Sequence, residues 1–247
     1  MTLKKKIPVH QLVAQRIAQI PEGIIFDYSS FEMPPADELS LSKALSRLAS
    51  QGTIARLTKG KYYKPRETQF GTLRPGESEI IKSLIYKGDK ITGYITGSPL
   101  YNRMALTTQV PNVLIIATNT VLPPKKIGQY RIKYSKQTAP ITEANIPLLQ
   151  ILDALKDIKR IMDASVNQSL TVLIGMIKKL SRTQQQQLVT LAENYNPATR
   201  ALLGALAETY LPKLNTRLLK ESLNAFSKYK IGVSKKILPG ASNWYII

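Results

Sequence analysis

The clearest pattern of apolar and polar positions is a helical one in the first quarter of the chain. Leu41, Leu45 and Leu48 recur at helical spacing and form one apolar stripe, and the positions around them are mostly small, polar or basic. Gly52 follows, and glycine most easily takes the left-handed conformation that ends a helix. The pattern therefore predicts a helix with one buried and one polar face.

A small basic hairpin is predicted directly after this helix. Residues 54–57 and 61–64 have the composition of strands, and residues 58–60 (Thr-Lys-Gly) are typical of the turn between them. Pro65 ends the pairing because proline has no N–H to donate to a neighbouring strand.

The residues before the leucine stripe predict a further helix. Pro8 stands at a position tolerated in a first turn, and the apolar face that follows consists of Val9, Leu12, Val13, Ile17 and Ile20. Residues 23–28 indicate a short extended segment. A second short helix is expected near residues 29–33, and the helix with the leucine stripe is expected to begin between residues 36 and 39.

These elements together favour a winged helix-turn-helix. Such a fold places a helix with a polar outer face in the major groove and a basic hairpin along the phosphates. The hairpin carries four closely spaced cations, Arg56, Lys59, Lys61 and Lys64. The alternative is an ordinary helix–hairpin unit whose charges form a solvated face.

The rest of the chain predicts a mixed α/β region followed by helices. The expected elements are a helix over 77–87, a strand or hairpin arm over 89–96, a short helix over 100–106, a buried strand over 113–118, a strand over 128–135, helices over 147–161, 170–180, 183–195, 197–210 and 214–227, and a final strand over 242–247 that returns to the middle sheet. Trp244 is expected in the core. The fold class is therefore α+β, with residues 1–66 as the DNA-binding domain, 67–75 as a linker and 76–247 as a C-terminal domain.

Composition narrows the class of protein. The net charge of +19 is spread over the chain and attracts polyanions. Without cysteine there can be no disulfide or thiol nucleophile. Residues 1–6 are basic and lead into an amphipathic pattern rather than a signal-peptide core, and no apolar run of about 18 residues exists. A cytoplasmic protein is expected.

The sequence offers few residues for catalysis. Residues 90–142 contain no Asp or Glu, and His10 is the only histidine, expected at the surface. Gly97-Ser98 is similar to the start of a nucleotidyltransferase site, but such a site needs carboxylates shortly downstream to hold metal. We therefore expect no enzyme activity, no cofactor and no metal site.

Three stretches of the chain carry a resemblance to a known family: KALSRLASQGTIARLTKGKYYKP (43–65), ITGYITGSPLYNRMALTTQVPNVLIIATN (91–119) and NPATRALLGAL (196–206). Through them the chain resembles the AbiEi-type abortive-infection antitoxins, which belong to type IV toxin–antitoxin systems. The second stretch, in its position after the first, is the more specific one. The irregular segment with Pro34-Pro35 departs from the family's pattern for the second helix.

The resemblance implies an antitoxin that represses its own operon through the winged helix and counters a nucleotidyltransferase-like toxin through the C-terminal region. The implied DNA-binding residues are Ser42, Lys43, Ser46 and Arg47 on the helix and Arg56, Lys59, Lys61 and Tyr63 on the wing. The implied partners are an operator in duplex DNA, with a homodimer on an inverted repeat as one arrangement, and the cognate toxin. No membrane partner is expected.

Two alternatives remain open. One is a plain transcription regulator whose C-terminal region binds an effector or dimerises. The other is an RNA-binding protein that uses the basic middle region, and a preference for A-form RNA over duplex DNA would favour it.

Overall fold

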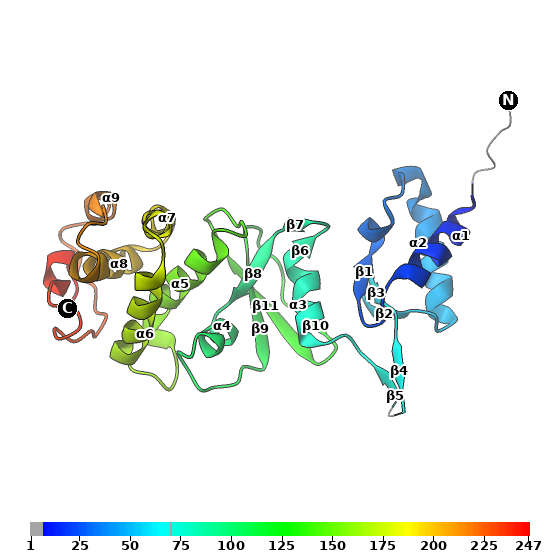
Figure 1. Ribbon diagram of the computed structural model, residues 1–247, viewed down its shortest axis with the longest axis horizontal. Helices are drawn as coiled ribbons and strands as arrows, with labels where there is room; N and C mark the ends of the chain where they lie inside the picture. Colours follow the sequence, from blue (N-terminus) through cyan, green and yellow to red (C-terminus); the bar gives the residue numbers. More distant parts are fainter. Residues whose placement is uncertain (1–6, 70) are drawn as a thin grey trace. The chain divides into compact units, whose positions relative to one another are not determined.

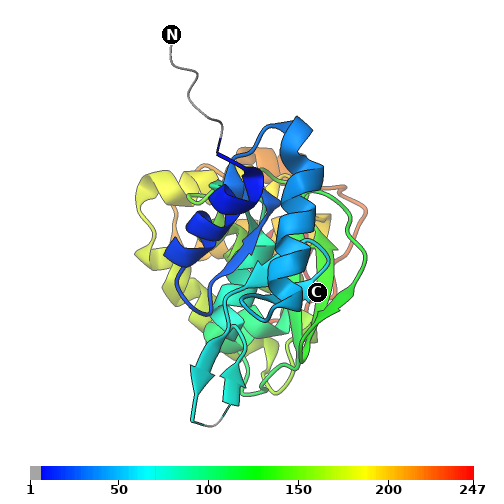
Figure 2. The ribbon, with the colours of Figure 1, turned by 90° about the vertical axis from the view of Figure 1, so that its right-hand side faces the viewer.

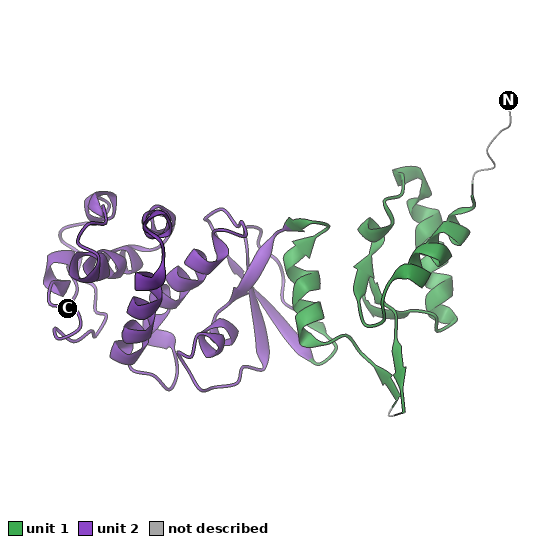
Figure 3. Cartoon of the chain, in the orientation of Figure 1, with its two compact units in different colours: residues 1–90, 126–129 green, residues 91–125, 130–247 purple. Residues whose placement is uncertain are grey.

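The computed structural model describes residues 7–69 and 71–247 of an α+β chain. Residues 1–6, whose basic character contributed to the expected location, lie outside the described residues, as does residue 70 within the expected linker. Contacts divide the chain into two units, residues 1–90 with 126–129 and residues 91–125 with 130–247 (Figure 3). No helix among the described residues has the length and hydrophobicity needed to cross a membrane.

The first unit opens with two helices and a small sheet. Helices α1 (Val9–Gln19) and α2 (Glu38–Ser50) lie side by side (Figure 2). Strands β1 (Ile25–Asp27), β2 (Ala55–Thr58) and β3 (Lys61–Tyr63) form an antiparallel sheet in the order β1-β3-β2 (Figure 1).

The segment between β1 and α2 contains two short 3-10 turns, η1 (Tyr28–Phe31) and η2 (Pro35–Asp37), in place of a regular second helix. The Asp27 carboxylate accepts the N–H of Ser29 at 2.9 Å, which fixes the start of η1. The prolines at 34 and 35 then limit how far a helix can extend before α2 begins.

The apolar stripes predicted from the sequence form the core of this unit. Val13 and Ile17 of α1 pack with Leu41 and Leu45 of α2, all of them at most 2 % exposed. Phe26 extends this core because it packs edge-on against Phe31 at 5.9 Å and stacks with Tyr62 at 6.3 Å between ring centroids. Leu12, expected on the same apolar face, is 38 % exposed instead.

The segment expected to be a linker forms a hairpin, so that prediction is corrected. Strands β4 (Arg66–Thr68) and β5 (Gly71–Leu73) pair antiparallel and extend away from α1 and α2 in both views (Figures 1 and 2). The Thr72 hydroxyl donates to the Glu67 carboxylate at 2.9 Å across the hairpin. Helix α3 (Glu77–Ile85) follows, then the short strands β6 (Tyr86–Lys87) and β7 (Lys90–Ile91).

A mixed sheet has the strand order β10-β11-β9-β8, and its strands β8, β9 and β11 belong to the second unit. Its strands are β8 (Gly93–Thr96), β9 (Val113–Thr118), β10 (Lys125–Ile127) and β11 (Tyr130–Lys136), and helix α4 (Ser98–Arg103) follows β8. Strand β9 has the bounds that its continuous apolar run predicted. It pairs parallel with β11 and antiparallel with β8.

Helices make up the rest of this unit. They are α5 (Ile146–Lys156), the 3-10 turn η3 (Ile158–Arg160), α6 (Val166–Lys179), α7 (Arg182–Ala192), α8 (Pro197–Tyr210), α9 (Arg217–Glu221) and the 3-10 turn η4 (Ala241–Trp244). Capping side chains fix three of the starts: the hydroxyls of Ser165 and Ser181 and the amide oxygen of Asn196 accept N–H groups of the first turns of α6, α7 and α8. Helix α9 is much shorter than the helix predicted over 214–227.

The final strand predicted over 242–247 is wrong. Residues 241–244 form η4 instead, and Ile246 makes a single parallel bridge to Tyr229 rather than joining the middle sheet. Trp244 is buried, as expected, at 3 % exposure, and its ring packs against Gly204 of α8. The indole N–H donates to the Glu208 carboxylate at 2.6 Å. This packing of the tryptophan against α8 holds the segment away from the sheet.

A buried carboxylate joins the sheet to the helices. Asp153 of α5 is 2 % exposed and accepts hydrogen bonds from the hydroxyls of Tyr94 (2.9 Å), Thr96 (2.6 Å) and Tyr195 (2.9 Å). The Gln137 amide donates to the oxygens of Tyr94 (2.7 Å) and Tyr195 (2.9 Å). A buried charge is tolerated only when such donors satisfy it, so these five residues, which we call the Asp153 cluster, depend on one another.

Replacing the carboxylate tests this dependence. Asp153→Asn removes the charge that three hydroxyls satisfy and turns an amide N–H₂ toward hydroxyl donors, so the free energy of unfolding should fall by about 2–4 kcal/mol. Urea unfolding followed by the fluorescence of Trp244, the single tryptophan, measures it. Asp163→Asn makes the same change on an exposed loop and should stay within about 0.5 kcal/mol of the parent. Equal losses in the two variants would contradict a central role for Asp153.

The same region should make the protein sensitive to alkali. Burial raises the pKa of Tyr94, Tyr101 and Tyr195, and nearby carboxylates raise each pKa further. Because the folded pKa exceeds the unfolded value of about 10, the stabilisation is complete below about pH 10 and is lost as pH rises above it, by up to about 1.4 kcal/mol per pH unit for each tyrosine. Absorbance near 295 nm should leave at least three of the 12 tyrosines un-ionised until Trp244 fluorescence reports unfolding. Ionisation of all 12 tyrosines while the protein is still folded would contradict this expectation.

Candidate nucleic-acid interface

The outer face of α2 is polar and basic. Leu41, Ala44 and Leu45 turn inward and are buried, and this leaves Lys43, Ser46 and Arg47 exposed and Ser42 half-buried. The side chains of Ser42 and Ser46 are short, so they do not project from the helix beyond Lys43 and Arg47. A helix with this outline can approach base edges in a groove without steric obstruction.

Strand β2 and the turn that follows it present two further cations. Arg56 and Lys59 are exposed, and Gly60 has a φ of 75°, the left-handed conformation that lets the chain reverse within a short turn. The pairing shifts register between Arg56 and Thr58, so the hairpin bends locally. In the part of the chain that the structure describes, none of Lys43, Arg47, Arg56 and Lys59 forms an ion pair with a carboxylate.

Two of the expected wing contacts are corrected by the structure. Tyr63 is only 6 % exposed because β3 is the central strand of its sheet and Tyr63 packs inside the unit. The Lys61 ammonium donates to the backbone carbonyl of Ser83 in α3, and its side chain is half-buried. Neither side chain is therefore available to a ligand in front of α2.

Tyr28 belongs to the surface, although the sequence did not single it out. Its pKa is lowered by hydrogen bonding to Ser42 of α2 and to Tyr62, and the positive charges of Arg56 and Lys59 lower it further. A Cβ at Gly60 would lie 3.6 Å from the Tyr28 ring, which places the ring against the turn. Tyr28 therefore connects the helix to the hairpin. The only sequence signal was its position directly after Asp27, which caps η1.

The structure thus brings six of the expected residues to the two elements that Tyr28 connects. We call this set, with Tyr28, the basic face: Tyr28, Ser42, Lys43, Ser46, Arg47, Arg56 and Lys59. Its four cations and small polar residues provide charge for phosphates and hydrogen-bonding groups for base edges. His10 lies exposed on α1.

The Gly97-Ser98 pair in the second unit has a packing explanation. Gly97 precedes α4 with a φ of 67°, and a Cβ there would lie 2.6 Å from Cδ1 of Ile115. Only glycine fits so close to the sheet. Within residues 7–69 and 71–247, no group of three or more His, Cys, Asp or Glu side chains is placed to hold a metal ion.

Comparisons with known proteins place the chain in a family. A structural search finds the crystal structure of the RV2827C protein from Mycobacterium tuberculosis, which is 9 % identical, with 94 % of this chain and 88 % of that chain covered and a TM-score of 0.46. No curated protein matches the sequence. Residues 12–189 match a family of unknown function, DUF6088. Because this match spans well over half of the chain, the protein belongs to the DUF6088 family.

Proposed function

We propose that the first unit is a winged helix-turn-helix that binds duplex DNA through the basic face. The observation that carries the proposal is the combination of strand order and exposure. The order helix, strand, 3-10 turns, helix and hairpin, with the sheet order β1-β3-β2, supports this fold, although 3-10 turns stand where a second helix was expected. The helix that would enter the groove leaves Lys43, Ser46 and Arg47 exposed.

Each part of the basic face has a role in this proposal. Helix α2 lies in the major groove, where Arg47 is suited to the two acceptors of guanine and Lys43 to a neighbouring base or phosphate. Arg56 on β2 and Lys59 in the turn after it contact phosphates and set the position of the helix. Tyr28, through its interactions with Ser42 and the turn, holds helix and hairpin in one orientation.

We further propose the cellular role that the antitoxin resemblance implies. The protein represses its own toxin–antitoxin operon through the first unit and counters a nucleotidyltransferase-like toxin through the second. Binding as a homodimer to an inverted repeat is the arrangement we expect on the operator. What supports this role is the resemblance alone, so a neighbouring toxin gene is the simplest independent check.

The proposal is tested on the upstream DNA of the protein's own gene, with Arg47 as the specific probe. The full chain should bind this duplex more tightly than a scrambled one at about 150 mM salt. Arg47→Ala should cost about 1–3 kcal/mol on the upstream site and much less on scrambled DNA, because a base contact is lost. Fluorescence anisotropy measures both. If the parent binds both duplexes equally and loses both with salt, the net charge alone explains binding and the proposal fails.

Two lysines of the hairpin provide a matched pair for the phosphate contacts. Lys59→Ala should weaken all duplexes alike and reduce the slope of log K against log salt by about one. Lys61→Ala removes the same charge two residues away, but its ammonium is bound to Ser83, so the slope should stay unchanged while the first unit loses stability. Salt titrations and urea unfolding of both variants separate the two effects. If Lys61→Ala reduced the slope of log K against log salt more than Lys59→Ala did, Lys61 rather than Lys59 would be the phosphate contact.

A further inference from the structure

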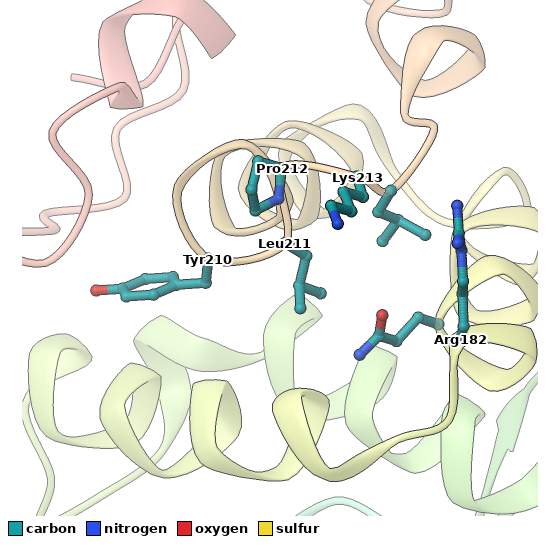
Figure 4. Close-up of a pocket in the computed structure, with 7 residues that line it drawn as sticks. Arg182, Tyr210, Leu211, Pro212 and Lys213 are labelled. Carbon is teal, nitrogen blue, oxygen red and sulfur yellow. The ribbon is translucent and has the colours of Figure 1, made fainter.

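A surface hollow of about 440 Å³ lies in the second unit, between the start of α7 and the connection from α8 to α9. Figure 4 shows Leu211 between Tyr210 on one side and Lys213 and Arg182 on the other. The volume is in the range of small-molecule sites, about 300–1,000 Å³. The hollow belongs neither to the basic face nor to the Asp153 cluster.

Two polar side chains of the lining, Tyr210 and Gln185, donate hydrogen bonds to the backbone of neighbouring segments. The Tyr210 hydroxyl donates to the carbonyl of Ile237 at 2.7 Å, and the Lys178 ammonium lies 4.5 Å from the centre of the Tyr210 ring. The amide of Gln185 donates to the carbonyls of Ile177 (3.3 Å) and Leu180 (3.1 Å) at the end of α6. The hollow is therefore formed before any ligand arrives, which lowers the cost of binding.

The lining separates into an apolar wall and a cationic rim. Leu211, Pro212 and Leu214 present carbon atoms, whereas Arg182 and Lys213 are exposed cations. Among the described residues, no carboxylate lines the hollow, and neither cation forms an ion pair. The start of α7 is fixed by Ser181, whose hydroxyl accepts the N–H of Gln184 at 3.2 Å, so the backbone from which Arg182 extends has a defined position.

We propose that this hollow binds a small aliphatic monocarboxylate. The carboxylate lies between Arg182 and Lys213, and the carbon chain lies on Leu211, Pro212 and Leu214. A guanidinium pairs with both oxygens of a carboxylate, and the lysine adds a second charge. The apolar wall is short, because three residues from one turn of chain form it. It suits the single aliphatic chain of a medium-length acid such as octanoate better than an extended peptide.

Equilibrium dialysis of the full chain with radiolabelled octanoate tests the proposal. Unlabelled octanamide, which keeps the chain and loses the charge, and acetate, which keeps the charge and loses the chain, should each compete at least about tenfold more weakly than octanoate. The double variant Arg182→Gln/Lys213→Gln should bind octanoate at least about tenfold more weakly. Lys235→Gln/Lys236→Gln removes the same charge from exposed residues outside the hollow and should leave the affinity within about twofold.

The contrary results are equally distinct. Octanamide competing as well as octanoate would show that the charge plays no part, and acetate competing equally would show that the wall plays none. Equal loss in both double variants would reduce the effect to net charge. Failure of the parent to bind octanoate at about 10 mM would overturn the proposal outright. Circular dichroism confirms that the variants, all at exposed positions, remain folded.

Discussion

The second unit depends on the burial of one charge. The Asp153 carboxylate can lie inside the protein because three hydroxyls donate to it and the Lys156 ammonium lies 3.7 Å away. Two of the hydroxyls come from β8, and the third comes from Tyr195, between α7 and α8. Each donor must therefore be placed to within the length of a hydrogen bond, which positions the edge of the sheet, α5 and the end of α7 together. Apolar contacts alone would allow the helices to slide over the sheet, because they have no direction. The directional hydrogen bonds from the three hydroxyls to Asp153 prevent the helices from sliding in this way.

The first unit is held by aromatic and aliphatic packing instead, and among its described residues the four cations of the basic face form no ion pair. Lys59 and Lys61 illustrate how position decides the use of one residue type. Lys59 lies at a turn, where the backbone reverses and the side chain meets solvent. Lys61 lies at the start of the central strand, where the neighbouring α3 offers a carbonyl at the end of its helix. The same charge is thus exposed to solvent at one position and bound to the backbone at the other.

The sequence predicted best those elements whose signals are local. Strand β9 and helix α8 have the predicted bounds because a continuous apolar run marks the first, and an asparagine cap with proline in the first turn marks the second. The misses depend on distant neighbours. A two-residue period could not show that Tyr63 and Lys61 would be covered on the central strand. Residues 242–247 have strand-like composition, yet Trp244 packs on α8, and no local pattern reveals this partner. Tyr28 was missed for the same reason.

Gly204 has a consequence for how the protein is made. The indole ring of Trp244 fills the space that a side chain at Gly204 would occupy. Helix α8 leaves the ribosome well before residue 244 does, so one of its faces stays uncovered during that interval. The first 90 residues, by contrast, contain nearly all of their own partners and can fold while synthesis continues. The basic face should thus exist on nascent chains whose second unit is still incomplete.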